Sequence, residues 1–166
     1  MKKAVFALLG CVIAVGSSTP ASAGPADDFC VGVTDESGQR TKLTCDVKPD
    51  SGKLKAARAE AIAANRQDLI TWYNDAGWST AGGWYEWWGT AGPCDREGYK
   101  TTMTGDQTVW RNKISSWRVW APCDSVMSYD VAGVESSASR RDNGSVWYVG
   151  DDWNDTIEMF RVSLRP

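Results

Sequence analysis

The sequence contains no histidine among its 166 residues. That absence excludes a Ser-His-Asp triad, a Cys-His pair, a histidine general base and a histidine-ligated zinc site. Positive charge is also in short supply: 18 lysines and arginines stand against 21 aspartates and glutamates. A nucleic-acid-binding protein needs a basic surface for phosphates, so we expect no nucleic-acid partner. The classes that remain are a binding module, an inhibitor, a toxin, or a hydrolase that works with carboxylates alone.

The first 23 residues have the pattern of a signal peptide. Lys2 and Lys3 precede an apolar run over residues 4–15, and Ala21-Ser22-Ala23 forms a small-residue cleavage site. The apolar run is too short to span a bilayer, and no later segment of the sequence is longer. We therefore expect a secreted protein without a membrane span, whose mature chain begins at Gly24 and is monomeric.

Cleavage at that site would remove one of the five cysteines and leave Cys30, Cys45, Cys94 and Cys123. Four cysteines in an exported chain predict two disulfides, with three possible pairings. Proximity in the sequence favours Cys30–Cys45 and Cys94–Cys123. Zinc binding is disfavoured, because no two of these cysteines have Cys-x-x-Cys spacing.

Sixteen glycines and ten tryptophans indicate sheets with tight turns rather than a helical bundle. Residues 24–81 predict an N-terminal extension, in which Cys30 and Cys45 close a hairpin around a turn at Asp35–Gly38. An alanine-rich stretch without Gly or Pro follows, and its apolar residues recur at three- and four-residue steps. This pattern predicts an amphipathic helix over residues 53–74, capped by Asp50 or Ser51. Such a helix serves either as a brace on the rest of the protein or as a partner-binding surface.

Two segments near the C-terminus repeat each other. Residues 110–119 and 153–162 align without a gap at an offset of 43, with Trp, Ile, Arg and Val identical. Nearly the same shift places Trp84–Trp87 on Met127–Asp130. We expect two units of four short strands each, which together form an eight-stranded antiparallel domain over residues 82–166.

The second unit resembles a Greek-key motif of the beta/gamma-crystallin superfamily, and more narrowly its secreted microbial members. The resemblance lies in Ser125–Val134 and Ser145–Ile157, and in the first unit in the Asn-x-Ile-Ser-Ser signature at residues 112–116. It does not cover residues 24–81. The fold that it implies is mostly β, a sandwich of two Greek keys with intertwined sheets.

In that family the signature forms a calcium site, in which a carbonyl and a hydroxyl from one motif join an acidic residue of the other motif's first strand. The resemblance implies two such sites, one made of Lys113 carbonyl, Ser115 and Asp130, the other of Thr156 carbonyl, Glu158 and Glu86. Calcium prefers six to eight oxygen ligands, and such a site would stabilise a small domain. Two departures weaken the match, because Arg111 replaces an acidic or amide residue and Glu158-Met159 replaces the Ser-Ser pair. The alternative is that these residues only close turns.

Residues 84–88 contain four aromatic side chains in five positions. In a strand, Trp84, Glu86 and Trp88 would share one face, while Tyr85 and Trp87 would share the other. These tryptophans either fill the core and the seam beneath the helix, or form an exposed platform for a sugar, a peptide or a protein.

Relatives that the chain resembles include peptidase inhibitors and killer-toxin-like proteins, which act through a rigid surface. We therefore expect a secreted, non-enzymatic inhibitor of an extracellular peptidase, which makes contact through Asp95–Tyr99, with Arg96 and Tyr99 as candidates. The alternative is a toxin or cell-wall glycan binder that uses Trp84, Trp87 and Trp88. A third alternative is a glycosidase with a carboxylate pair drawn from Glu86, Asp95, Glu97 or Asp130.

Overall fold

The computed structural model describes residues 29–90, 92, 94–103, 110, 113–131 and 138–165. The predicted signal peptide, Arg111 and Asn112 lie outside these residues. In chain order the elements are β1 (Phe29–Thr34), β2 (Arg40–Asp46), α1 (Gly52–Ala63), β3 (Gln67–Tyr73), η1 (Ala76–Trp78), β4 (Trp84–Gly89), β5 (Tyr99–Thr102), β6 (Ser116–Val119), β7 (Ser125–Tyr129), β8 (Ser139–Asp142) and β9 (Met159–Ser163). None of the helices among the described residues is long and apolar enough to cross a membrane.

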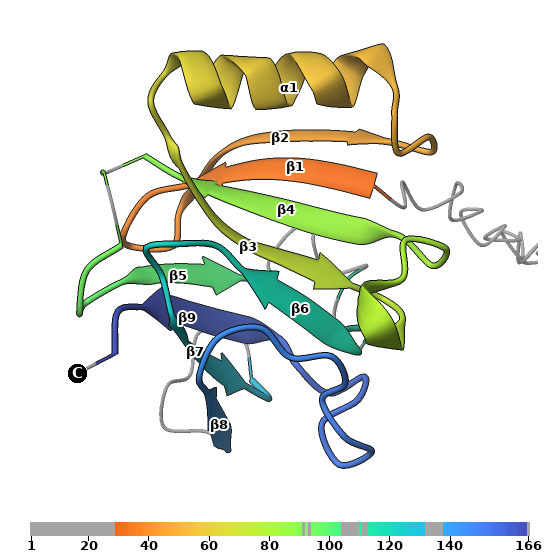
Figure 1. Ribbon diagram of the computed structural model, residues 1–166, viewed down its shortest axis with the longest axis vertical. Coiled ribbons are helices and arrows are strands. Elements are labelled where there is room, and N and C mark those ends of the chain that lie inside the picture. The colour runs from red at the N-terminus through yellow and green to blue at the C-terminus, as the bar shows by residue number, and fades with distance from the viewer. Residues whose placement is uncertain are drawn as a thin grey trace, which may run out of the picture.

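The strands form two sheets, and α1 makes a third layer (Figure 1). The first sheet, sheet A, has the order β2-β1-β4-β3-β6, and sheet B has the order β5-β9-β7-β8. Helix α1 lies on the outer face of sheet A, over β1 and β2 (Figure 1). Most strand pairs are antiparallel, but β1 runs parallel to β4.

The two sheets exchange strands. The segment β3–β6 gives β3, β4 and β6 to sheet A but sends β5 to sheet B, beside β9. The segment from β7 to β9 builds the rest of sheet B and sends Val146 back to sheet A, where it forms a bridge with Trp117 of β6. This exchange confirms the predicted crystallin-like sandwich of two Greek keys with intertwined sheets.

Of the two alignments in the internal repeat, the structure confirms the one with more identical residues. Strands β6 and β9 lie at the expected offset of 43, and each is the last strand of its motif. The second alignment was wrong, because the counterpart of β7 is β3 rather than β4. The hydrogen bonds show this: Ser115 N–H donates to the Tyr73 carbonyl at 3.0 Å, and Glu158 N–H donates to the Tyr129 carbonyl at 2.9 Å.

The predicted helix over residues 53–74 is only half right. Ser51 caps α1 as expected, since its side chain accepts a hydrogen bond from Leu54 N–H. However, the helix ends at Ala63, and Asn65 adopts a left-handed conformation that turns the chain. Residues 67–73 form β3 instead, because β-branched and aromatic residues such as Ile70, Thr71 and Trp72 favour a strand with both faces covered.

This strand moves the predicted domain boundary. Residue 82 falls between β3 and β4, which pair along their length, and β3 lies between β4 and β6. The expectation of eight strands within residues 82–166 is therefore wrong, since the first Greek key begins at Gln67. What precedes it is the hairpin β1–β2 and α1, and β1 extends sheet A beside β4.

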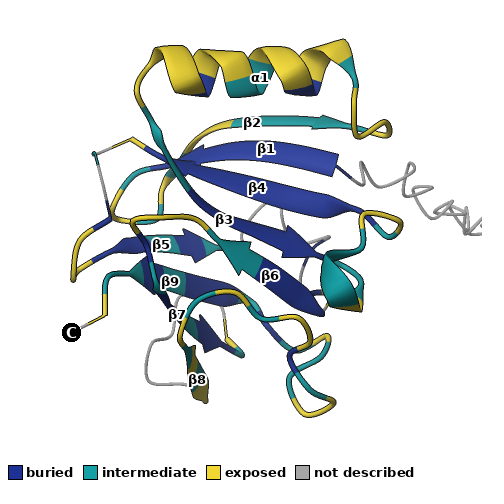
Figure 2. Cartoon of the chain, viewed as in Figure 1, coloured by how far each residue is buried: buried dark blue, intermediate teal, exposed yellow. Residues whose placement is uncertain are grey.

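Two apolar clusters hold the layers together (Figure 2). The larger lies between the sheets and includes Trp72, Trp87, Trp117 and Phe160, all with no exposed surface. The smaller lies between sheet A and α1, and contains Phe29, Val31, Val33, Leu54, Ala61, Tyr73, Trp84 and Trp88. Both predicted disulfides are confirmed: Cys30–Cys45 joins β1 to β2, and Cys94–Cys123 joins the loop before β5 to the loop before β7.

Candidate functional site

The tryptophans of β4 alternate between the faces of sheet A as the sequence predicted. Trp87 points into the core between the sheets, while Trp84 and Trp88 lie beneath α1. All three are at least 92% buried, with exposed fractions of 5% for Trp84, 0% for Trp87 and 8% for Trp88. The alternative in which they fill the core and the seam beneath the helix is therefore confirmed, and the alternative of an exposed platform is wrong, because α1 and sheet B cover the two faces of the strand.

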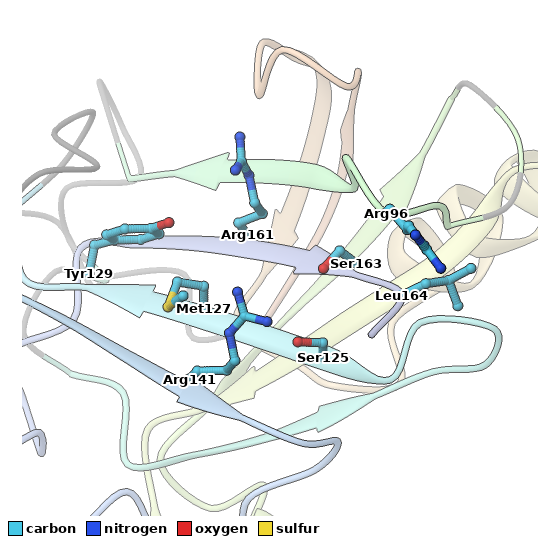
Figure 3. Close-up of a pocket in the computed structure, with 8 residues that line it drawn as sticks. All are labelled: Arg96, Ser125, Met127, Tyr129, Arg141, Arg161, Ser163 and Leu164. Atoms are coloured by element: carbon cyan, nitrogen blue, oxygen red, sulfur yellow. The ribbon is translucent and has the colours of Figure 1, made fainter. Parts of the chain in front are cut away.

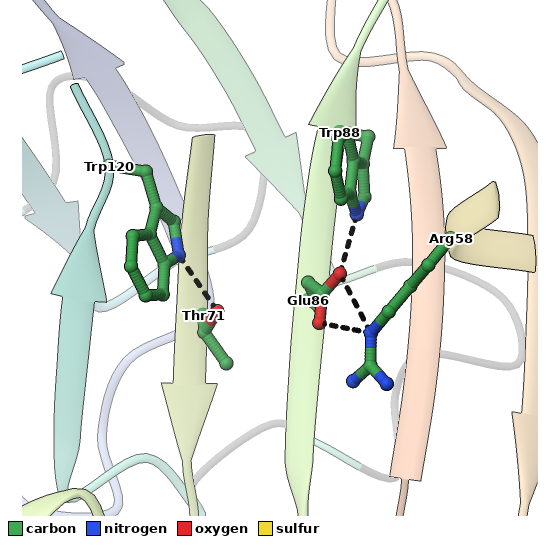
Figure 4. Close-up of polar contacts among 5 residues, drawn as sticks. All are labelled: Arg58, Thr71, Glu86, Trp88 and Trp120. Carbon is green, nitrogen blue, oxygen red and sulfur yellow. Dashed lines mark hydrogen bonds and ion pairs between the residues drawn. The ribbon is translucent and has the colours of Figure 1, made fainter. Parts of the chain in front are cut away.

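Glu86 occupies the same outer face and ties the helix to the sheet (Figure 4). Its carboxylate accepts two hydrogen bonds from Arg58 Nε of α1, at 2.9 and 3.2 Å, and one from Trp88 Nε1 at 2.7 Å. The Arg58 guanidinium also stacks on Trp84, 4.5 Å from the ring centroid. The predicted calcium set of Thr156, Glu158 and Glu86 is therefore wrong, since the Glu86 carboxylate is committed to a charge pair under α1.

Asp68 is a second carboxylate on this side of the sheet, and the sequence analysis missed it. Burial, with the nearby charge of Glu86 as a second cause, raises the pKa of Asp68 to about 8. Its Oδ1 is buried without a hydrogen-bond partner in the part of the chain that the structure describes. The side chain is therefore protonated at neutral pH. The sequence analysis missed this group because it placed Asp68 in the predicted helix over residues 53–74, as one of several charges on the polar face of that helix.

Asp130, predicted to join Lys113 and Ser115, lies instead beside the loop of its own motif. A cavity of about 220 Å³ is lined by Asp130, Ala138, Asp152, Trp153 and Thr156. Asp130 Oδ1 is buried and has no hydrogen-bond partner among the described residues. The cavity thus brings together two carboxylates and the Thr156 hydroxyl, which are hard oxygen donors of the kind that calcium prefers.

Ser115 and Glu158 occupy equivalent positions in the two motifs. Ser115 is buried, and its carbonyl accepts a hydrogen bond from Val149 N–H at 3.0 Å. The Glu158 carbonyl accepts the corresponding bond from Met103 N–H at 3.1 Å. These bonds join each motif to the strand that it receives from the other, so both signature segments have a structural role in the sandwich. Lys113 is exposed at the start of the first.

The loop at Asp95–Tyr99 is held at both ends. Cys94 is in a disulfide, the Asp95 carbonyl accepts from Leu164 N–H at 2.7 Å, and Asp95 Oδ1 accepts from Gly98 N–H at 2.7 Å. Gly98 has a φ of +68° and leaves no room for a side chain, since a Cβ there would lie 2.3 Å from the Val162 carbonyl oxygen. The loop therefore presents Asp95, Arg96 and Glu97 to solvent on a fixed backbone.

Tyr99, the other candidate in this loop, is not a contact residue. It is 2% exposed, and its hydroxyl donates to the Gly92 carbonyl at 2.7 Å. The carboxylates proposed for a glycosidase are also dispersed. Glu86 lies under α1, Asp130 lies at the end of β7, and Asp95 and Glu97 lie in the loop before β5.

The exposed aromatic side chains are ones that the sequence analysis did not select. Trp147 is 63% exposed, Tyr148 39% and Trp120 37%. Trp147 lies against Gly77, and Trp120 Nε1 donates to Thr71 Oγ1 at 3.0 Å on the outer face of sheet A (Figure 4). The signal that could have found them is position, because neither tryptophan lies within a strand: Trp120 follows the end of β6, and Trp147 follows Val146, which forms an isolated bridge.

Comparison of the sequence with protein-family models and with curated proteins finds no match. Among solved structures, the chain is similar to a betagamma-crystallin domain from Flavobacterium johnsoniae, at 19% identity over 59% of this chain and 97% of that one, with a TM-score of 0.43. A betagamma-crystallin domain from Clostridium beijerinckii has 17% identity over 57% and 97% of the two chains, with a TM-score of 0.42. The N-terminal domain of Protein S has 20% identity over 59% and 98%, with a TM-score of 0.42.

Proposed function

We propose that this protein is an exported, non-enzymatic binding protein that inhibits an extracellular peptidase through the loop at residues 95–97. The observation that carries the proposal is the way this loop is held. A disulfide, two hydrogen bonds and the tight approach of Gly98 fix its backbone while three charged side chains face solvent. A preorganised loop loses little conformational entropy on binding, which raises its affinity for a complementary cleft.

Arg96 is the expected anchor of this contact. Arginine is enriched among the residues that contribute most to protein interfaces, because its planar guanidinium combines charge with a stacking surface. The two disulfides also suit an exported protein, since such bonds persist in oxidising compartments.

The test is an inhibition assay of the mature protein against metallo-, serine and cysteine peptidases. We expect stoichiometric inhibition of one class, which Arg96→Ala weakens by about tenfold or more. Lys55→Ala on α1 is the matched control, because it removes an exposed positive charge from the opposite layer. No inhibition of any peptidase, or equal loss in both variants, would overturn the proposal.

A second candidate is glycan binding, which the exposure of Trp120 and Trp147 favours. Indole rings of this kind stack on the apolar faces of sugars. Retention on chitin, glucan or peptidoglycan that Trp147→Ala abolishes would support this function. Trp88→Ala is unsuitable for the test, because Trp88 is buried and donates to Glu86.

We also propose that the cavity at Asp130 holds calcium. The residues fit the ion, since Asp130, Asp152 and Thr156 supply oxygen donors and Asp130 Oδ1 is buried without a protein partner in the described part of the chain. The ion would join β7 to the loop before β9, and its contribution would be to stability.

A further inference from the structure

We propose that the outer face of sheet A at β6 binds a linear, β-linked polysaccharide over several of its sugar units. This inference rests on the second candidate function, glycan binding, and specifies both the ligand and the surface that contacts it. Helix α1 covers β1 and β2 on this face, whereas β6 forms an edge of the sheet on the far side of β4 and β3 (Figure 1). The proposed surface is this edge.

Two exposed indole rings stand at opposite ends of β6. Trp120 directly follows the strand. At the other end, Val146 forms a bridge with Trp117, so the next residue, Trp147, lies beside the start of the strand. Four strand residues between these positions, at about 3.3 Å per residue, separate the two tryptophans by roughly 13 Å. One sugar ring cannot contact both indoles across that distance, but a chain of sugars can.

Each of the two rings is held in place by a neighbour. Trp120 Nε1 donates to Thr71 Oγ1 at 3.0 Å (Figure 4). A Cβ at Gly77 would lie 3.2–3.3 Å from three consecutive atoms of the Trp147 ring, so Gly77 covers one face of that ring. Because Trp147 is nevertheless 63% exposed, its other face is open for stacking. Rings that are already fixed lose little conformational entropy when a ligand binds.

Arg118 lies between the two rings and supplies hydrogen-bond donors. It is opposite Thr71 on the neighbouring strand, so it shares the outer face with Trp120. Its guanidinium lies over the ring of Trp78, 4.4 Å from the centroid, and Trp78 Nε1 is itself fixed by two backbone carbonyls. Arg118 forms no ion pair with any residue that the structure describes. Its N–H groups can therefore donate to a ligand.

This alternation of rings and donors favours a glycan over a protein partner. A sugar offers apolar ring faces to the indoles and hydroxyl groups to the guanidinium. A protein interface instead buries a contiguous apolar centre, whereas Arg118 and Thr71 separate the rings here. The sugars of a β-linked hexose chain follow one another in an extended ribbon, which matches a straight strand, while an α-linked chain curves away from it.

The opposite face of the sandwich provides a comparison. A cavity of about 120 Å³ on the outer face of sheet B is lined in part by Arg96, Arg141 and Arg161, and its one aromatic lining residue, Tyr129, is 5% exposed (Figure 3). That face therefore has arginines without an exposed ring. Arg141, which is exposed there, is a matched control for Arg118.

The experiment is titration calorimetry of the full mature chain with cello- and chito-oligosaccharides of two and six units. We expect the hexamer of at least one series to bind about tenfold more tightly than its dimer, and Trp120→Ala and Trp147→Ala each to weaken hexamer binding by about tenfold. Ile62→Ala is the control, because it removes an exposed apolar side chain from α1. Arg118→Gln should also weaken hexamer binding, and Arg141→Gln should not. Thermal melting of each variant confirms that it is folded.

Two results would overturn the extended site. If hexamer and dimer bind equally and Trp147→Ala alone abolishes binding, glycan binding stands but the chain does not reach Trp120. If no oligosaccharide binds, glycan binding falls as well. In that case, a dimer in analytical ultracentrifugation that Trp120→Ala dissociates would identify the surface as an interface between two copies of this chain. None of these variants alters residues 95–97, so peptidase inhibition is tested separately.

Discussion

Arg58 of α1 and Glu86 of β4 form a charge pair that is mostly shielded from solvent, with Nε 2.9 Å from Oε2. The Glu86 side chain is 11% exposed and the Arg58 side chain 32%. The same carboxylate accepts from Trp88, and the same guanidinium covers Trp84. One pair therefore connects the helix to two tryptophans of the sheet, in a layer that the crystallin-like sandwich does not itself contain.

The first prediction concerns this pair. Glu86→Gln leaves the Arg58 charge unpaired and should lower the free energy of unfolding by about 1–3 kcal/mol, the usual range for a hydrogen bond to a charged group. Chemical denaturation measures the change. Glu60→Gln is the control, because Glu60 on the same helix pairs with Lys42 at the surface, where an ion pair contributes little. Equal effects of the two substitutions would contradict a special role for Glu86.

The second prediction concerns the domain boundary. A fragment of residues 82–166 should not unfold cooperatively, because it lacks β3 and leaves β4 and β6 without the strand between them. Trp72, which stacks on Phe160 at 4.9 Å in the core, would also be missing. Near-UV circular dichroism and thermal melting of the fragment and the full mature chain provide the comparison. A sharp melt of the fragment would show that β3 is dispensable.

The sandwich was predicted from the resemblance to a known family, which rests on local patterns in the sequence. The internal repeat supported two motifs, and its matched segments include β6 and β9, the last strands of the two motifs. The first strand of the first motif was missed, since residues 67–73 continue an alanine-rich helix without a Gly or Pro to mark the break. Only the left-handed turn at Asn65 and the neighbours β4 and β6 decide that this segment is a strand.

The same error passed into the candidate sites. Taking β4 as the first strand of the first motif led to Glu86 as its acidic residue, whereas the counterpart of Asp130 is Asn74, which follows Tyr73 as Asp130 follows Tyr129. Burial was a further obstacle, because the alternation of Trp84, Trp87 and Trp88 is compatible with either a core or a platform. The covering helix, which decides between the two, packs there through Leu54 and Ala61, and that contact is not visible in the pattern of β4 itself.

The third prediction concerns calcium. At 1 mM calcium and a dissociation constant of about 0.1 mM, the ion would add about 1.4 kcal/mol to the free energy of unfolding. The melting temperature should therefore rise, and Asp130→Asn should remove most of the rise. Glu86→Gln should retain the rise even though it destabilises the protein, because Glu86 is elsewhere. A melting temperature that calcium leaves unchanged in the unsubstituted protein would show that the cavity does not hold the ion.

The fourth prediction concerns pH. The carboxyl of Asp68 has a pKa of about 8 in the folded protein, against the ordinary value of 3.8, mainly because it is buried and secondly because Glu86 is nearby. Between these two values the folded chain keeps a proton that the unfolded chain releases. The free energy of unfolding should therefore fall as pH rises from about 4 to about 8, by up to about 1.4 kcal/mol per pH unit from this group, and level off above that range.

Denaturation curves at intervals from pH 5 to pH 9 test this prediction. Asp68→Asn removes the titrating group while preserving the shape of the side chain, so it should flatten the decline and make the protein more stable than the unsubstituted chain near pH 9. Asp50→Asn, which changes the same charge on an exposed turn, is the matched control. If Asp68→Asn leaves the pH dependence as steep as before, the proton that is lost between pH 4 and pH 8 belongs to another group, and Asp68 is ionised beneath α1.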